Sequence, residues 1–166
     1  YRIIHKNLEN EMTFLEKINS PQDLKKIALN DLDKVAEEVR QAVLNRNCKI
    51  GGHVGPNLAI VEPTIALHYV FNSPVDKIIY DVSHQSYPHK ILTGRKECFL
   101  IDDAMKKVGG YTDPNESEHD FFKIGHPSTS VSLACGLAKA RDLTGEKHNV
   151  IAVIGDGSLS GGEDIA

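Results

Sequence analysis

An acidic residue between two glycines, directly after an apolar run, is the feature that most restricts the fold of this chain. Residues 149–154 read Asn-Val-Ile-Ala-Val-Ile and are followed by Gly155, Asp156, Gly157 and Ser158. A short run this rich in branched apolar side chains predicts a fully buried strand, as in parallel sheets. We therefore expect an α/β protein with a mostly parallel sheet flanked by helices.

The corner after this strand has two interpretations. Glycines let the backbone turn sharply and approach an anion, and a carboxylate at the carboxyl end of a parallel strand can hold a hard cation such as Mg²⁺. Asp and Gly are also the commonest residues of plain turns. The residues around Asp156 are therefore equally compatible with a site that binds phosphate and a metal ion and with an ordinary turn.

Composition excludes several other classes of protein. The 166 residues are 40% hydrophobic and 25% charged, which is typical of a globular protein, and the net charge of −4 argues against a nucleic-acid partner. The sequence shows no apolar run long enough for a membrane span and no signal peptide. Its three cysteines, Cys48, Cys98 and Cys135, have no metal-type spacing. Reduced thiols in a cytoplasmic protein are the simplest interpretation.

The amino-terminal third is expected to be helical. Residues 1–19 show no sustained period and predict an arm, so the domain is expected to span residues 20–166. Ser20, with Pro21 and Asp23 after it, is a helix start signal for a short helix to about Leu29. Apolar residues at helical spacing then predict an amphipathic helix from about residue 31 to residue 46.

The next segments hold two histidines outside the predicted regular elements. Residues 51–57 place His53 among three glycines and a proline, which indicates either a functional loop or a plain exposed turn. A buried helix follows over residues 58–71, kinked at Pro63 or starting there. Residues 77–82 predict a strand that leads directly to His84.

In an open parallel sheet, ligands gather beyond the carboxyl ends of the strands, so His84 and Asp156 are expected to lie near one another. Zinc binding by His84 and His89 is weakly supported because no further ligand has recognisable spacing. Residues 93–95 and the polar run 102–120 predict connecting loops, and the longer of them suits a lid or a disordered segment equally well.

The last predicted helix covers residues 131–143, capped near Ser128 and ended by Gly145. Its small residues favour close packing on a sheet. Gly125 and His126 stand just before its amino terminus, where free backbone amides and the helix dipole would favour an anion. Taken with the corners at His53, His84 and Asp156, this pattern predicts a site for a phosphorylated, metal-associated ligand.

Several words of the sequence closely resemble the amino-terminal part of the 1-deoxy-D-xylulose 5-phosphate synthase family. The resemblance covers roughly residues 14–163, and transketolase, the nearest competing relative, lacks this wording. The words are Gly52-His53-Val54-Gly55, residues 66–71, Asp81-Val82-Ser83-His84-Gln85, Tyr87-Pro88-His89-Lys90, Leu92-Thr93-Gly94-Arg95, Gly125-His126 with Ser128-Thr129-Ser130, and Ile154-Gly155-Asp156-Gly157.

The resemblance implies a thiamine-diphosphate-binding fold and a set of site residues. Asp156 is similar to the family's Mg²⁺ ligand, and Gly157 and Ser158 to residues that contact the cofactor diphosphate. His84, with the segment Gly125-His126-Pro127, is similar to thiamine-diphosphate contacts. The catalytic histidines implied are His53, which would face the substrate and assist proton transfer, together with His84 and His126.

The implied activity condenses pyruvate, with loss of CO₂, onto glyceraldehyde 3-phosphate, in a homodimer. The product would serve isoprenoid, thiamine and pyridoxal biosynthesis. The cofactors are thiamine diphosphate and Mg²⁺: the thiamine carries the carbanion chemistry and the metal anchors its diphosphate.

The sequence also departs from the family pattern. Pro63 and Pro127 stand where the family has other residues, and Asp164-Ile165 is unusual. The Asn that completes the family's metal shell, the pyrimidine-binding domain and the carboxyl-terminal domain are expected beyond Ala166. The chain is thus either an enzyme segment that is inactive alone, or a non-catalytic remnant or binding module. A transketolase-type enzyme and an unrelated phosphate-binding domain are the further alternatives.

Overall fold

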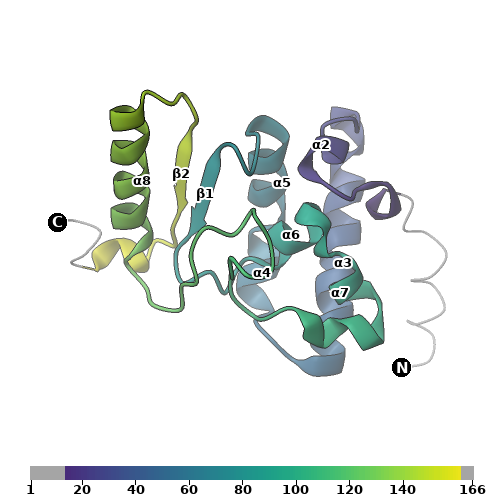
Figure 1. Ribbon diagram of the computed structural model, residues 1–166. Helices are drawn as coiled ribbons and strands as arrows, with labels where there is room; N and C mark the ends of the chain where they lie inside the picture. Colours follow the sequence, from purple (N-terminus) through teal and green to yellow (C-terminus); the bar gives the residue numbers. More distant parts are fainter. Residues whose placement is uncertain (1–13, 162–166) are drawn as a thin grey trace. The chain divides into compact units, whose positions relative to one another are not determined.

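The computed structural model describes residues 14–161, which fall into two units (Figure 1). The first unit consists of the described residues up to Val70 together with Tyr87–Val108. The second takes Phe71–Ser86 and the described residues from Gly109 onward. The domain expected over residues 20–166 stays a prediction. The departure expected at Asp164-Ile165 lies outside the described residues.

The first unit is helical. Its α-helices are α2 (Pro21–Leu24), α3 (Leu32–Ile50), α4 (Gly55–Ala59), α5 (Val61–Val70), α6 (Tyr87–Lys90) and α7 (Glu97–Leu100). Short 3₁₀ turns lie at η1 (Leu15–Lys17), η2 (Leu29–Asp31) and η4 (Asp102–Lys107), and a π-type turn, η3, at Ile91–Arg95.

Helix α3 is the centre of this unit and confirms the predicted amphipathic helix. Its face of Val35, Val39 and Val43 is fully buried, because residues spaced by four positions lie on one side of a helix. This face shares one apolar core with α5, α6 and α7. The helix runs four residues beyond the predicted end and stops at Gly51, whose φ of 77° suits glycine.

The start of the chain differs from the prediction. Leu15 and Ile18 are fully buried in the same core, so residues 14–19 are packed structure and not an arm. The predicted helix over residues 20–29 is wrong in length: α2 ends at Leu24. The N–H groups of Lys26 and Ile27 donate to carbonyls three positions earlier, which tightens the chain there. Leu29 is 68% exposed, so it adds nothing to a buried face.

The predicted helix over residues 58–71 is two helices, α4 and α5, that meet at Ile60. Pro63 lies in the first turn of α5, where its missing N–H would have no partner within the helix. The regular helix therefore starts just before the proline, and no kink is needed.

The second unit holds a parallel pair of strands, β1 (Lys77–Tyr80) and β2 (Val150–Val153), in the register Lys77 to Val150 through Tyr80 to Val153. Helix α8 (Ser130–Thr144) connects back to β2, and the 3₁₀ turn η5 (Ser158–Ser160) follows it. The α/β character is confirmed in coarse form, as a small parallel sheet within a mostly helical chain.

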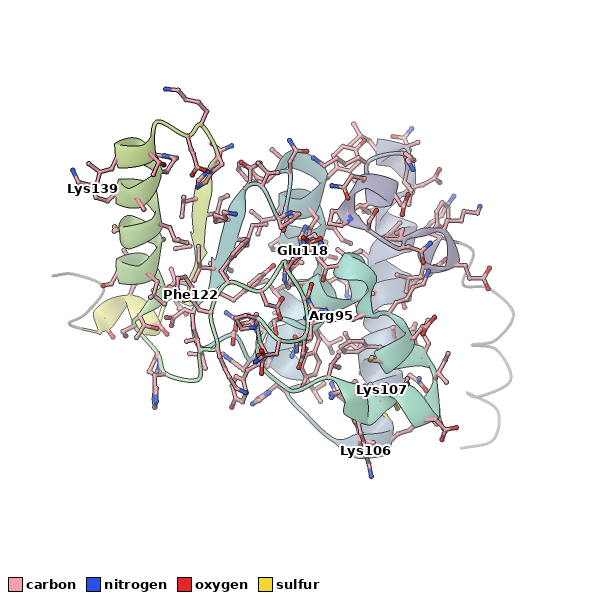
Figure 2. All side chains as sticks on the ribbon, viewed as in Figure 1. Arg95, Lys106, Lys107, Glu118, Phe122 and Lys139 are labelled. Atoms are coloured by element: carbon pink, nitrogen blue, oxygen red, sulfur yellow. The ribbon has the colours of Figure 1, made fainter. Side chains whose placement is uncertain are left out.

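Strand β2 is half-buried along its length, so the expectation of a fully buried strand is wrong for the described residues. The apolar core of this unit gathers around Ile79, Ile124 and Ala134, and Phe122 packs against it (Figure 2). Within residues 14–161, β2 has a neighbouring strand only in β1. Within these residues the other edge of β2 therefore has no strand to pair with, which accounts for the partial exposure of β2.

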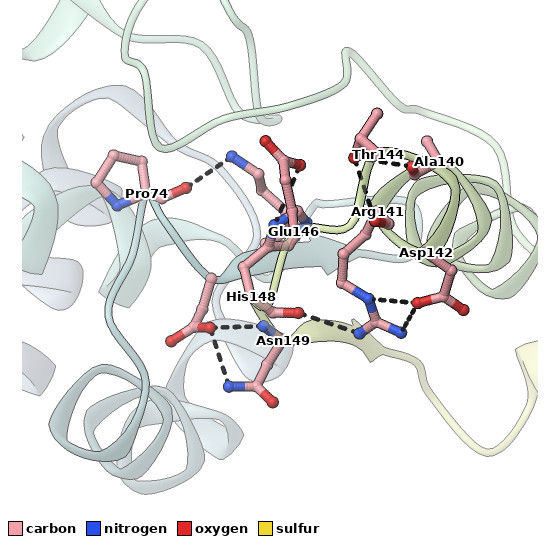
Figure 3. Close-up of polar contacts among 10 residues, drawn as sticks. Pro74, Ala140, Arg141, Asp142, Thr144, Glu146, His148 and Asn149 are labelled. Carbon is pink, nitrogen blue, oxygen red and sulfur yellow. Dashed lines mark hydrogen bonds and ion pairs between the residues drawn. The ribbon is translucent and has the colours of Figure 1, made fainter.

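Asp76 fixes the amino ends of both strands, and its partner Asn149 is labelled in Figure 3. Its Oδ1 accepts hydrogen bonds from the backbone N–H and the side-chain Nδ2 of Asn149, at 2.7 and 3.0 Å, and its Oδ2 accepts one from the Asn72 N–H at 2.6 Å. Burial raises the pKa of Asp76, but these hydrogen bonds outweigh it and hold the pKa below its usual range. The carboxylate thus pins the register of the pair.

The two predicted loops are only partly loops. Residues 93–95 lie in the turn η3, where Gly94 has a φ of 89° and separates two helical segments. Residues 102–107 form the 3₁₀ turn η4, and only the part from about residue 108 to residue 120 lacks longer regular structure. A lid in this stretch stays a prediction.

Candidate functional site

The carboxyl ends of β1 and β2 lie at the same edge of the second unit, because the strands are parallel and adjacent. The backbone N–H of Asp81 donates to the Val153 carbonyl at 2.8 Å, so the pairing continues one step past the strand ends. His84 follows β1 and Asp156 follows β2. The two residues thus follow strands that end at one sheet edge, and their expected proximity stays a prediction.

The Asp156 corner is open. Gly155, Asp156 and Gly157 are exposed, and a side-chain Cβ built at either glycine would meet no atom within 4 Å. One exposed carboxylate fits the chemistry of a Mg²⁺ ligand, since proteins often hold Mg²⁺ through one or two carboxylates, phosphate oxygens and water. Among residues 14–161, however, no group of three or more His, Cys, Asp or Glu side chains could hold a metal. Asp156 would therefore be one ligand of several.

The start of α8 corrects one expectation. The backbone amides there are not free for a ligand, because the Asp81 carboxylate already accepts from them. Its Oδ2 accepts from Ser128 N–H at 3.1 Å, and its Oδ1 accepts from Thr129 and Ser130 N–H at 3.0 and 3.2 Å. The anion that this helix terminus favours is the chain's own side chain.

Gly125, His126 and Pro127, which directly precede these amides, are exposed. A Cβ built at Gly125 would meet no atom within 4 Å. The segment is thus accessible to a ligand through its own backbone and the His126 ring, although the helix terminus behind it is occupied.

The segment that carries His84 is strained and firmly held. Val82 and Ser83 have φ values of 57° and 67°, a conformation that costs a β-branched residue in particular. The buried Ser83 hydroxyl donates to the Ile124 carbonyl at 3.0 Å and accepts from the Thr112 N–H at 3.0 Å. The half-buried His84 ring therefore stands on a backbone with little freedom.

Three buried oxygen atoms in the second unit have no hydrogen-bond partner within the described part of the chain. They are Gln85 Oε1, Ser86 Oγ and Ser130 Oγ. Buried polar atoms are nearly always paired with protein, water or ligand. Two of them follow His84 directly and the third begins α8, so polar bonding capacity at this edge fits a polar ligand.

His53 lies in the first unit and is held by Asn57 and Tyr87. Asn57 Nδ2 donates to the His53 carbonyl at 2.7 Å, and the His53 N–H donates to Tyr87 Oη at 3.4 Å. Gly52 has a φ of 138°, and a Cβ there would meet Tyr87 Oη at 2.6 Å. The backbone of this glycine-rich segment is thus held in place, and a functional role for its histidine stays a prediction.

His89 takes part in a buried pair in the first unit. Its Nδ1 lies 2.9 Å from Nε2 of His68, and the two rings are stacked with centroids 5.0 Å apart. Tyr87, Pro88 and Lys90 are buried beside it. This half of the motif therefore packs the core, which argues further against zinc binding by His84 and His89.

The structure brings His84, His126 and Asp156 into the second unit and places His53 in the first. The grouping of His53 with the other three stays a prediction. Sequence reasoning missed Asp81 and Asn57. The position of Asp81 directly after a strand could have identified it as a candidate, whereas nothing in the sequence indicated that Asn57 would hold the backbone of His53.

The remaining chemistry of the chain is plain. Cys48, Cys98 and Cys135 are free, which confirms that they form no disulfide in the structure. In residues 14–161 no helix has the length and apolar character that crossing a membrane requires.

Comparison with known proteins assigns the family. Residues 15–165 match the family described as 1-deoxy-D-xylulose-5-phosphate synthase. Relatives of that name include those of Caldanaerobacter subterraneus subsp. tengcongensis, 58% identical over 148 residues, and Brevibacillus brevis, 53% identical over 148 residues; each comparison covers 89% of this chain and 24% of the relative. The relative of Thermomicrobium roseum is 51% identical over 150 residues, which is 90% of this chain and 24% of the relative. The chain thus spans about a quarter of these curated relatives and belongs to the 1-deoxy-D-xylulose-5-phosphate synthase family.

Proposed function

We propose that this chain is the amino-terminal part of an enzyme that condenses pyruvate with glyceraldehyde 3-phosphate, releasing CO₂ and forming 1-deoxy-D-xylulose 5-phosphate. The observation that carries the proposal is the family match over residues 15–165, with 58% identity to a relative of that name. The arrangement of His84 and Asp156 at one sheet edge supports it. The cytoplasm is the expected location, and a homodimer the expected assembly.

Each site residue has a role in this proposal. Asp156 supplies one Mg²⁺ ligand, and the exposed backbone at Gly157 and the half-buried Ser158 bind the cofactor diphosphate. His84 and the segment of Gly125, His126 and Pro127 bind and orient the rest of the cofactor.

Thiamine diphosphate, when bound, supplies the carbanion chemistry. His53, His84 and His126 hold or move protons near the reacting atoms, since imidazole changes its charge near neutral pH. The half-buried position of His53, fixed through its own backbone by Asn57, suits such a role.

The test uses the full natural protein that carries this sequence. Purified protein with thiamine diphosphate and Mg²⁺ should release CO₂ only when pyruvate and glyceraldehyde 3-phosphate are both present, and mass spectrometry should detect the pentulose phosphate product. Asp156→Asn should abolish the activity, and Glu118→Gln, an exposed change, should not.

The alternatives give different results in the same assay. A transketolase-type enzyme would use a ketose phosphate as donor and release no CO₂. A remnant or binding module would show neither reaction, although cofactor binding would still raise its thermal stability. An unrelated phosphate-binding domain would show no stabilisation by thiamine diphosphate.

A further inference from the structure

A single buried carboxylate links three segments of the second unit that lie far apart in the sequence. Asp81, 1% exposed, accepts from the backbone N–H groups of Ser128, Thr129 and Ser130. Its own N–H continues the ladder to Val153. The end of β1, the start of α8 and the end of β2 thus meet at one side chain.

The link extends to the Asp156 corner through Ser128. The Ser128 hydroxyl donates to the Ser158 carbonyl at 2.9 Å, and a Cβ built at Gly161 would lie 1.8 Å from that hydroxyl oxygen. The chain after the corner therefore packs directly on Ser128. Displacing Ser128 would displace the backbone of Ser158, which the proposed function assigns to the cofactor diphosphate.

Backbone strain gathers at the same place. Among the described residues other than glycine, only Val82, Ser83 and Ser128 have positive φ. Two of them directly follow Asp81, and the third donates its N–H to it. Strain of this kind persists only where the surroundings over-determine the conformation, and it gathers at functional sites. All three strained residues are therefore next to Asp81, either in the sequence or through a hydrogen bond to its carboxylate.

The carboxylate is also charged. Burial raises the pKa of Asp81, but hydrogen bonds from the backbone at residues 128–130 and from the Ser158 side chain outweigh it and hold the pKa below its usual range. An anion here is compatible with a neighbouring diphosphate because those donors absorb its charge. It also keeps the α8 amides occupied, so these amides are not available to a diphosphate.

We propose that Asp81 is a positioning residue that holds the Gly125–Pro127 segment and the Ser158 backbone in the arrangement that binds the cofactor diphosphate. The inference rests on the proposed function. A cap that only stabilises the fold is the competing interpretation, and it predicts a loss of stability without a specific loss of cofactor affinity.

Asp76 provides a matched control. It is a buried carboxylate that directly precedes β1, whereas Asp81 directly follows it, and it also accepts backbone N–H groups. The full natural protein is compared with Asp81→Asn and Asp76→Asn. Both changes replace one carboxylate oxygen with an NH2 group, which donates but cannot accept, so both should lower the melting temperature. Only Asp81→Asn should raise the dissociation constant for thiamine diphosphate with Mg²⁺, by about tenfold or more.

A second variant keeps the inference testable if Asp81→Asn fails to fold. Ser128→Ala removes only the hydroxyl bond to Ser158 and should weaken cofactor binding by about threefold to tenfold. In the cofactor-free wild type, the amides of residues 128–130 should exchange hydrogen slowly, and in a folded Asp81→Asn protein they should exchange faster.

The outcomes separate the two proposals. Wild-type protein that does not bind thiamine diphosphate overturns the proposed function. Wild-type protein that binds it, while Asp81→Asn or Ser128→Ala keeps an affinity within twofold of wild type or Asp76→Asn loses as much, overturns only the inference about Asp81.

Discussion

Asn57 Oδ1 accepts a hydrogen bond from the backbone N–H of Tyr87 at 2.8 Å, across 30 positions of sequence. The same side chain donates through Nδ2 to the His53 carbonyl. The side-chain amide of Asn57 therefore both accepts and donates a hydrogen bond, and the residue is fully buried. This bridge ties the histidine loop to the start of α6.

Replacement of Asn57 by Asp should cost about 2 kcal/mol of unfolding free energy, because the donor to the His53 carbonyl is lost and a buried charge replaces it. In the full protein, kcat/KM should also fall, because the backbone of His53 loses the hydrogen bond from Asn57. Urea unfolding and steady-state kinetics give the two values. Asn45→Asp is the matched control, because Asn45 also donates to a backbone carbonyl, that of Phe99. A similar fall in kcat/KM for both variants would refute the role of the bridge.

Alanine at Gly52 should destabilise the first unit by roughly 1–3 kcal/mol or more, because its Cβ would lie 2.5 Å from Asn47 Oδ1 and the backbone is in a conformation that favours glycine. At Gly55 a Cβ would meet nothing within 4 Å, so Gly55→Ala should leave stability nearly unchanged or raise it. Melting temperatures measured by circular dichroism compare the two. Equal effects would mean that Gly52 is not confined in solution.

The strain at Val82 gives a third expectation. Glycine there relieves roughly 1–2 kcal/mol of left-handed strain but adds about 0.5–1 kcal/mol of unfolded-chain entropy, so Val82→Gly should be neutral or slightly stabilising. Val75 is 64% exposed and has no positive φ, so Val75→Gly should lose about 0.5–1 kcal/mol. Chemical denaturation of both variants settles the sign, and an equal loss in both would show that Val82 is unstrained.

Asp23 supplies a pH-dependent contribution. A hydrogen bond from Lys26, assisted by Asn19 and Ser20, lowers the pKa of Asp23 to about 2. Because the folded pKa lies below the ordinary value, the stabilisation is complete above about pH 4 and is lost as the pH falls toward 2. Asp23→Asn should therefore cost about 1 kcal/mol at neutral pH and only about 0.3 kcal/mol near pH 2.5.

Unfolding free energies at the two pH values check this expectation. Glu118→Gln is the control, because that side chain is exposed in the second unit. A constant difference between wild type and Asp23→Asn across the pH range would contradict the assignment.

Some of this structure could be predicted from local sequence. The spacing of Val35, Val39 and Val43 gave α3, and Gly145, with a φ of 75°, closes α8 as its residue type suggests. These features depend on neighbours a few positions away, which a sequence displays directly.

Features that depend on distant contacts could not be predicted in the same way. The amides at the start of α8 are bound by Asp81, about 48 positions earlier, and that pairing follows only from the folded sheet. The residues of the candidate site could therefore be proposed from the sequence, whereas the contacts that hold them were found only in the structure.

The pairing of β1 with β2 has a consequence for how the protein is made. The contact of Asp76 with Asn149, at the start of the two strands, joins residues 73 positions apart. At roughly 5–20 residues per second, a ribosome needs about 4–15 s to deliver the second strand after the first. During that interval Ile78 and Ile79, which are buried in the finished structure, have no β2 to pair with, so the nascent chain carries an unpaired apolar strand until residues 150–153 have been made.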